Sequence, residues 1–181
     1  MKKYDFLVIG SGIAGLVFAL EVSKIGTVAV LCKKSLHDCN SDYAQGGIAA
    51  VLDNHDSYEN HVEDTYKAGV ELGKIPVIKE IVASGPAAIQ FLIDIGTNFT
   101  KKNPLYDGSF ENISLTREGG HSQQRVAHVA DSTGFEIMQA LIAACKKKDN
   151  IEIFENHLAV DLITQHHILQ DEGFIPGITC W

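Results

Sequence analysis

The sequence has 181 residues, of which 45% are hydrophobic and 21% are charged, and its formal net charge at pH 7 is -8. These values are typical of a soluble globular chain of about one domain. The acidic balance argues against nucleic-acid binding, because a phosphate-binding surface needs a concentration of Lys and Arg that only residues 146–148 approach.

The sequence also argues against membrane and metal sites. The apolar stretch 77–95 is interrupted by Lys79, Glu80 and Asp94, which favours an amphipathic helix over a membrane span, and no signal-like segment lies near the start. The cysteines at 32, 39, 145 and 180 form no Cys-x-x-Cys pair and share no zinc-site spacing with histidines. We therefore expect a reduced, cytoplasmic chain without a metal or a membrane partner.

The start of the chain has a strand-helix-strand pattern. Asp5 to Ile9 is a short apolar run typical of a buried parallel strand, Ile13 to Lys24 has helical spacing of apolar residues, and Thr27 to Leu31 is a second strand. A polar loop and the small-residue stretch 43–50 follow. The two adjacent glycines of this stretch suggest that its backbone packs closely against another segment.

Helical patterns dominate the middle of the chain. We expect one helix from Ser57 and a second helix opened by Pro76. A third helix is expected over Ala87 to Ile95, because Ser84-Gly85-Pro86 indicates a break before it.

The last third of the sequence mixes extended and helical patterns. Residues 97–116 are extended with a turn signal at 106–109, which predicts an antiparallel β hairpin region. The remaining predicted elements are a helix over 131–148 and strands over 151–154 and 159–164. Residues 177–181 have the pattern of a returning strand that is cut off, so we expect residues 1–181 to be the amino-terminal part of a larger domain.

A Gly-x-Gly-x-x-Gly motif lies between the first predicted strand and the first predicted helix, which is the context that gives this motif meaning. It consists of Gly10, Ser11, Gly12, Ile13, Ala14 and Gly15. The first glycine permits a tight turn, the second lets the backbone approach a pyrophosphate, and the third lets helix and strand pack closely. The motif favours dinucleotide binding over a purely structural turn, but it does not distinguish nicotinamide from flavin dinucleotides.

The residue that closes the second predicted strand is Cys32, followed by Lys33, where a carboxylate would bind the adenosine ribose in a typical NAD-binding unit. The missing acid weakens the interpretation as a generic NAD-dependent dehydrogenase. Lys33 faces either the ribose or the solvent, and the sequence leaves both alternatives open.

Residues 41–50, Ser-Asp-Tyr-Ala-Gln-Gly-Gly-Ile-Ala-Ala, resemble the second flavin-contacting segment of the succinate dehydrogenase, fumarate reductase and L-aspartate oxidase family. The resemblance implies an α/β fold with a Rossmann-like FAD-binding domain, in which a parallel sheet with flanking helices is joined by the antiparallel β hairpin region. Besides the glycine motif and Lys33, it implies cofactor contacts for Asn40, Ser41, Asp42, Tyr43, Ala44, Gln45, Gly46, Gly47, Leu158 and Ala159.

Two positions point to the L-aspartate oxidase branch of this family. Asn40 stands where the dicarboxylate dehydrogenases typically carry the histidine that bonds to FAD, so the resemblance implies non-covalent FAD. Residues 115–122, Leu-Thr-Arg-Glu-Gly-Gly-His-Ser, resemble the oxidase signature in which the counterpart of Glu118 orients the substrate. A carboxylate suits aspartate, which differs from succinate by one ammonium group. The alternative is a loop glutamate that faces water.

The resemblance implies an enzyme that oxidises L-aspartate to iminoaspartate with FAD as the hydride acceptor, as the first step of NAD synthesis through quinolinate. O2 or fumarate would reoxidise the flavin, and quinolinate synthase would take the product. The arginines that bind the dicarboxylate, with the capping and C-terminal helical domains, are expected beyond Trp181, so residues 1–181 alone should be inactive. The alternatives are a fumarate reductase or succinate dehydrogenase flavoprotein subunit and a non-catalytic dinucleotide-binding module.

Overall fold

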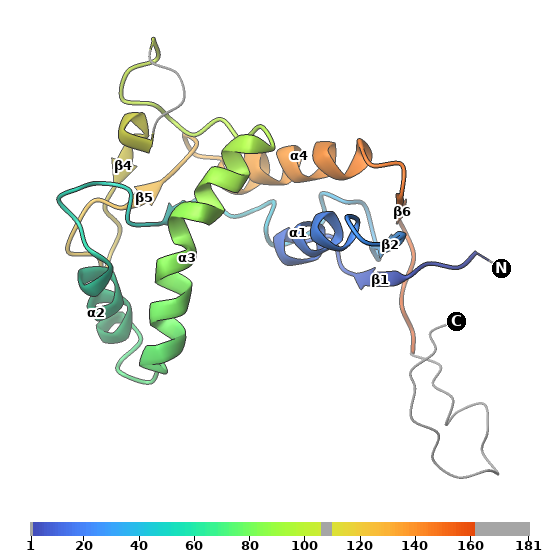
Figure 1. The fold of residues 1–181 in the computed structure, drawn as a ribbon, viewed down its shortest axis with the longest axis horizontal. Coiled ribbons are helices and arrows are strands. Elements are labelled where there is room, and N and C mark those ends of the chain that lie inside the picture. The colour runs from blue at the N-terminus through green and yellow to red at the C-terminus, as the bar shows by residue number, and fades with distance from the viewer. Residues whose placement is uncertain (1, 106–109, 162–181) are drawn as a thin grey trace.

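The computed structural model describes residues 2–105 and 110–161, which form two groups of elements (Figure 1). One group is a parallel sheet with two helices beside it, and the other is a helix pair next to a small antiparallel sheet. The α-helices within the described residues are α1 (Ile13–Val22), α2 (Tyr58–Ala68), α3 (Ile75–Asp94) and α4 (Thr133–Lys146). In this view α4 lies above α1 and runs from near the end of α3 toward β6.

The parallel sheet has the strand order β1-β2-β6. Its strands are β1 (Phe6–Ile9), β2 (Val28–Leu31) and β6 (Ile151–Phe154). Because parallel neighbours cannot be joined by a tight turn, α1 forms the crossover from β1 to β2. Leu16 and Ala19 of α1 are fully buried in the core that α1 shares with α4. The predicted strand-helix-strand unit is therefore confirmed.

The antiparallel sheet has the strand order β3-β5-β4. Its strands are β3 (Ile48–Ala49), β4 (Leu115–Thr116) and β5 (Val126–Ala127), and the short 3-10 helix η1 (Phe110–Asn112) precedes β4. Gly47 lies directly before β3, and a Cβ atom there would be 2.4 Å from the carbonyl oxygen of Ala127. The expected close packing of the glycine pair is thus found at Gly47, while a Cβ on Gly46 would have open space around it. An α/β fold with an added antiparallel region is confirmed.

Helix α3 is continuous across residues 84–86, so the expectation of two separate helices is wrong. Pro86 lies inside the helix, where it removes one backbone hydrogen bond. The helix nevertheless continues because it has buried residues on both sides of the proline, Val82 before it and Ile89 and Leu92 after it. Tertiary packing overrides the local break signal here.

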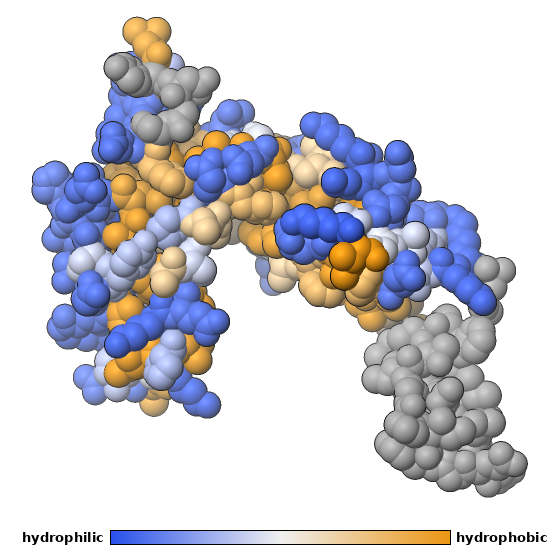
Figure 2. All heavy atoms as spheres, in the orientation of Figure 1, coloured by the Kyte–Doolittle hydropathy of each residue, from blue (hydrophilic) through white to orange (hydrophobic). Residues whose placement is uncertain are grey.

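Among the described residues, α3 is the one helix whose length and composition would suit a membrane span, and 17% of its apolar window is buried. This criterion uses length and composition only, and the core helix of a soluble protein meets it too, so the amphipathic helix expected from the charges at 79, 80 and 94 stays a prediction. Figure 2 shows hydrophobic side chains at the surface around α2 and α3. The exposed apolar residues there include Val70, Leu72, Ile75, Val77 and Ile81.

The remaining predicted elements have different outcomes. The helix over 131–148 is present as α4, and the strand over 151–154 is present as β6. Residues 159–161 are not in a strand, and the rest of the predicted strand 159–164 lies outside the described residues. The predicted turn at 106–109 and the strand over 177–181 also lie outside them.

The first turn of α4 lies against the loop that contains Ser41 and Ala44. The backbone N–H of Gly134 donates a hydrogen bond of 2.8 Å to the carbonyl oxygen of Ala44. A Cβ atom on Gly134 would lie 2.1 Å from the carbonyl oxygen of Ser41 and 2.6 Å from that of Ala44. Only glycine therefore lets this loop reach the amino-terminal end of α4.

Replacing Gly134 with alanine should lower the free energy of unfolding of the full-length protein by about 1 to 3 kcal/mol, because the new methyl group overlaps loop backbone. Urea unfolding measures this change. Gly46→Ala, which adds the same group in open space, is the matched control and should stay within about 0.5 kcal/mol of wild type. Equal stability of Gly134→Ala and wild type would show that the loop does not contact α4 in solution.

Candidate functional site

The glycine motif forms a tight turn between β1 and α1. Gly10 has a φ of +110°, a conformation that favours glycine, and its N–H donates to the carbonyl oxygen of Leu31 over 2.8 Å. A Cβ atom on Gly15 would lie 2.2 Å from the carbonyl oxygen of Gly10. The first and third glycines therefore have the structural tasks that the motif predicts, a tight turn and close helix-strand packing.

The amino-terminal end of α1 is suited to an anion. Gly12 is its N-cap residue and has no side chain to satisfy the free amides, and the first turn holds no acidic residue. Ser41 comes from the second predicted segment, and its Oγ accepts a hydrogen bond of 3.2 Å from the N–H of Ile13. The helix dipole and backbone amides of such an end favour a phosphate group.

A groove opens beside this turn, along the carboxyl-terminal ends of β1 and β2. The N–H of Cys32 donates to Phe154 over 2.9 Å, and the N–H of His157 donates to Cys32 over 2.9 Å, so the chain after β6 is held next to the end of β2. Burial raises the pKa of the Cys32 thiol, which keeps it neutral. Lys33 is exposed, while Lys34 forms an ion pair of 2.8 Å with Asp38.

Six of the predicted cofactor residues line this groove. They are Gly10, Ser11, Gly12, Lys33, Leu158 and Ala159. Seven further lining residues were not predicted as contacts, namely Ile9, Leu31, Cys32, Lys34, Asp38, Cys39 and His157. Most of these residues flank the ends of parallel strands, which is where α/β sheets bind ligands. The ends of the predicted strands could therefore have been used to predict them as contacts.

The second predicted segment lies next to the turn but outside the groove. Residues 43–47 and Asn40 are exposed, and the link between Ser41 and α1 holds the segment close to the glycine turn. Asp42 is mostly buried and has a hydrogen bond of 2.9 Å to His37. The structure thus brings the two predicted segments together, while the cofactor role of each residue stays a prediction.

Glu118 lies on the loop between β4 and β5. Its side chain is exposed, and among the described residues its carboxylate has no hydrogen-bond or ion-pair partner. The loop turns back at this point, with a hydrogen bond of 3.2 Å from the N–H of His121 to the carbonyl oxygen of Glu118. Gly120 in the same turn has a φ of +85°.

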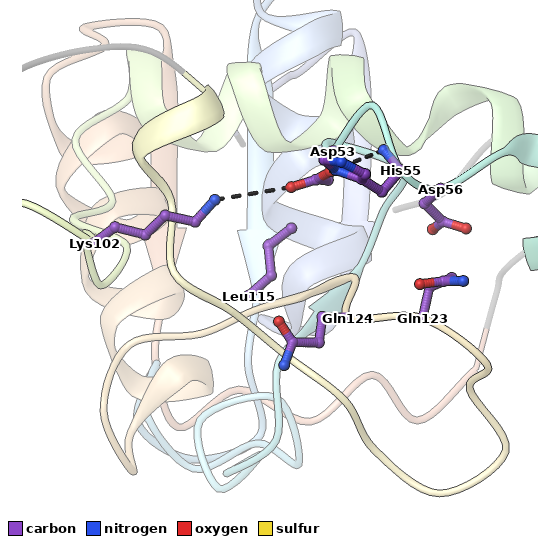
Figure 3. Close-up of a pocket in the computed structure, with 7 residues that line it drawn as sticks. All are labelled: Asp53, His55, Asp56, Lys102, Leu115, Gln123 and Gln124. Carbon is purple, nitrogen blue, oxygen red and sulfur yellow. Dashed lines mark hydrogen bonds and ion pairs between the residues drawn. The ribbon is translucent and has the colours of Figure 1, made fainter.

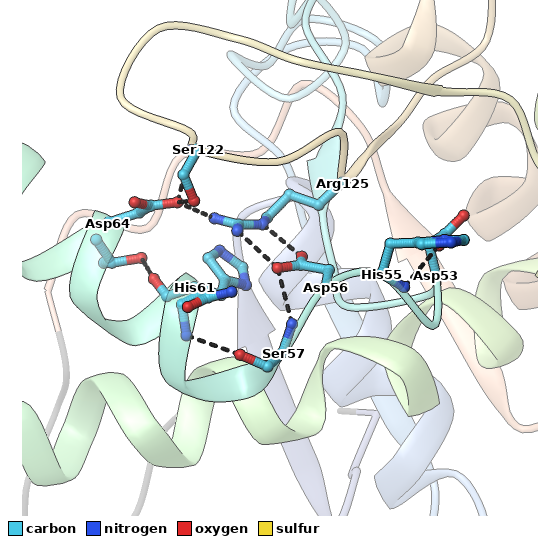
Figure 4. Close-up of polar contacts among 10 residues, drawn as sticks. Asp53, His55, Asp56, Ser57, His61, Asp64, Ser122 and Arg125 are labelled. Atoms are coloured by element: carbon cyan, nitrogen blue, oxygen red, sulfur yellow. Dashed lines mark hydrogen bonds and ion pairs between the residues drawn. The ribbon is translucent and has the colours of Figure 1, made fainter.

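A buried ionic cluster lies next to this loop, where Ser122 meets Asp64 (Figure 4). Arg125 is fully buried. Its Nε and Nη2 donate to the two carboxylate oxygens of Asp56 over 2.7 and 2.9 Å, and its Nη1 donates to Asp64 Oδ2 over 2.6 Å. The same Asp64 oxygen accepts from the N–H and the Oγ of Ser122, each over 2.7 Å. A buried charge needs this degree of pairing to be tolerated.

Two histidines adjoin the Arg125 cluster, and their ring centroids are 6.0 Å apart. Burial and the nearby charges of Arg125 and His121 lower the pKa of His61, which favours its neutral form. Among the described residues, the Nδ1 atoms of His61 and His121 and the Nε2 atom of His128 are buried without a hydrogen-bond partner. The link of His61 to His121 and Arg125 required the tertiary structure, because these residues are far from His61 in the sequence.

A polar hollow on the other side of Asp56 contains none of the predicted site residues (Figure 3). Asp53 pairs with two other groups of the hollow: His55 contacts Asp53 over 2.7 Å, and the Lys102 Nζ lies 3.9 Å from Asp53. In the described part of the chain, no group of three or more His, Cys, Asp or Glu residues is arranged to hold a metal ion. The groove at the glycine turn is the better candidate for a cofactor site, because six of the predicted cofactor residues line it.

Asp64 gives the fold a pH dependence. Burial alone would raise the pKa of Asp64, but hydrogen bonds from Ser122 and Arg125 outweigh this effect and lower the pKa from 3.8 to about 2. A carboxylate whose pKa is lower in the folded state stabilises the fold above its unfolded pKa, and that contribution is lost as the pH falls through the folded value. This group should therefore remove about 1 to 2 kcal/mol of unfolding free energy between about pH 5 and pH 2.

Urea unfolding of the full-length protein over that pH range tests this expectation. The Asp64→Asn variant should be less stable at neutral pH and show a shallower loss on acidification, because asparagine does not titrate. The same pH slope in both proteins would contradict the role of Asp64.

Comparison with known proteins agrees with this geometry. A family model described as an FAD binding domain matches residues 5–179. The chloroplastic L-aspartate oxidase of Arabidopsis thaliana is 47% identical over 163 residues, which covers 90% of this chain and 24% of that protein. The L-aspartate oxidase of Acinetobacter baylyi is 42% identical over 171 residues, which covers 93% of this chain and 30% of that protein.

Solved structures show the same fold. The quinol fumarate reductase of E. coli matches with a TM-score of 0.80 at 28% identity, covering 90% of this chain and 27% of that chain. The chain thus corresponds to about a quarter to a third of the length of these relatives. Since the family model matches nearly the whole chain and the glycine turn opens a strand-helix-strand unit, this chain belongs to the FAD-binding domain family.

Proposed function

We propose that this chain is the FAD-binding part of an oxidoreductase that converts L-aspartate to iminoaspartate. One observation carries the proposal: the glycine turn and the 41–47 segment meet at the amino-terminal end of α1, through the hydrogen bond between Ile13 and Ser41. The names of the relatives at 42% to 47% identity support L-aspartate as the substrate.

The residues around the glycine turn fit FAD. The free amides at the start of α1 suit the pyrophosphate, and the absence of Cβ atoms at Gly10 and Gly12 leaves room for close backbone approach. Lys33, Leu158 and Ala159 line the groove where the adenosine half would bind. When bound, FAD would supply the hydride acceptor for oxidation of the substrate α carbon. The protein residues bind the cofactor and hold it in place.

Asn40 supports non-covalent binding, because an asparagine amide cannot form the bond to FAD that a histidine makes. It is exposed next to the segment 41–47, so it is free to face the cofactor. This position separates the proposal from its main alternative, the flavoprotein subunit of a fumarate reductase or succinate dehydrogenase. The alternative is supported by the structural similarity to fumarate reductase.

Glu118 supports an amino acid as the substrate. Its exposed carboxylate is available to pair with the ammonium group of aspartate, which succinate and fumarate lack. Further parts of the proposal are O2 or fumarate as the electron acceptor and quinolinate synthase as the enzyme that takes the product. A non-catalytic dinucleotide-binding module would leave Glu118 without a task.

The attachment of FAD can be tested directly on the full-length protein. After acid precipitation, we expect the yellow flavin to remain in the supernatant, because Asn40 forms no covalent bond. The supernatant absorbance near the flavin band is the measurement. A yellow pellet would contradict the proposal and favour the dicarboxylate dehydrogenase alternative, while a colourless protein throughout would argue against FAD.

Replacing Glu118 with glutamine should lower kcat/KM for L-aspartate oxidation by about 10-fold to 100-fold, the loss expected for one charge-assisted contact to an ammonium group. Fumarate reduction, measured with a reduced dye, should change by less than about threefold, because fumarate has no ammonium group. Glu111→Gln, an exposed glutamate in η1, is the matched control. Equal losses in both reactions would refute the orienting role of Glu118.

A further inference from the structure

The loop that carries Glu118 is attached to α2 at three consecutive residues. Gly120 lies against Ala68, since a Cβ atom on the glycine would be 3.3 Å from the alanine Cβ. The ring of His121 contacts the ring of His61 edge to face at 6.0 Å. Ser122 donates two hydrogen bonds of 2.7 Å to Asp64. Helix α2 is therefore the support on which this loop rests.

Asp64 is the most firmly fixed of these supports. Its Oδ2 atom accepts three hydrogen bonds, one from Arg125 and two from Ser122, and 14% of its side chain is exposed. Arg125 is itself held by two hydrogen bonds to Asp56. The position of Ser122 is thus fixed by short charge-assisted hydrogen bonds that run from Asp56 through Arg125 to Asp64. The Arg125 guanidinium at the centre is fully buried.

Glu118 depends on this attachment because its own side chain has no partner among the described residues. The location of its carboxylate follows from the loop backbone. That backbone is fixed at one end by β4 and at the other by Ser122, and the hydrogen bond from His121 to Glu118 closes the turn between them. Releasing Ser122 would therefore let the Glu118 carboxylate occupy a wider range of positions.

We propose that Asp64 is a positioning residue that holds the Glu118 carboxylate in place for the substrate ammonium group. Asp64 acts through Ser122 and the turn and does not itself contact the substrate. This inference rests on the proposed function, because it assigns Asp64 a task in substrate recognition by the same site. An alternative role for Asp64 is purely structural, as a counter-ion that keeps Arg125 paired.

A double-mutant cycle in the full-length protein separates the two roles. The single variants are Asp64→Asn, Ser122→Ala and Glu118→Gln. The double variants combine Glu118→Gln with Asp64→Asn or with Ser122→Ala. The matched control is Asp94→Asn on the surface of α3. Each is measured for kcat and KM in L-aspartate oxidation, for fumarate reduction and for FAD content. If Asp64 acts through Glu118, Asp64→Asn should lower kcat/KM for aspartate about tenfold, and Ser122→Ala about threefold, with the loss mainly in KM.

In the Glu118→Gln background the same substitutions should lower kcat/KM by less than about twofold, because the group that they position is already gone. Fumarate reduction and FAD content should remain near wild type in Ser122→Ala. Additive losses, or equal losses with aspartate and fumarate, would overturn the positioning role. If Asp64→Asn fails to retain FAD, the cycle with Ser122→Ala alone tests the positioning role. The Ser122→Ala substitution removes one hydroxyl and leaves the ion pair between Asp64 and Arg125 intact.

The two proposals can fail separately. A wild-type protein that does not oxidise L-aspartate would overturn the proposed function and this inference with it. A wild-type protein that oxidises L-aspartate, with additive losses in the cycle, would overturn the inference alone.

Discussion

The loop that contains Ser41 and Ala44 is held between the amino-terminal ends of two helices, and the arrangement of the site depends on this contact. Ser41 accepts a hydrogen bond from the first turn of α1, and Ala44 accepts one from the first turn of α4. Both helix ends have a glycine at the point of contact, Gly12 and Gly134, because a larger residue would meet the loop. Three segments that are distant in the sequence are thereby joined through this loop.

The two parts of the site are stabilised by different physical means. The groove at the glycine turn relies on backbone geometry, namely the positive φ of Gly10 and the close approach of Gly15, so charge plays little part in its construction. The loop with Glu118 relies on buried charge, because Arg125 and its two carboxylates connect the loop to α2. A site built from backbone groups suits a ligand group that does not vary, such as a pyrophosphate. A loop held in place by buried ion pairs suits the proposed task of distinguishing substrates by a single charge.

Short motifs made a large part of the fold and site predictable. The glycine spacing predicted the turn, because the local backbone conformation or close packing there favours glycine. The apolar runs located β1, β2 and β6. The break at Pro86 was predicted wrongly, since buried residues on both sides of it hold α3 together. The ion pairs of Arg125 with Asp56 and Asp64 left no local pattern in the sequence, because their partners are 69 and 61 residues away.

The sequence by itself determined the chemistry available to this protein: a glycine turn for a dinucleotide, an asparagine at position 40 and a glutamate at position 118. These features depend on residue type and short spacing, which a linear pattern records. The tertiary structure alone decided which residues support them, including the α4 contact at Gly134 and the attachment of the Glu118 loop to Asp64. Those contacts join segments that meet only after the helices pack, so their physical cause is long-range burial and pairing.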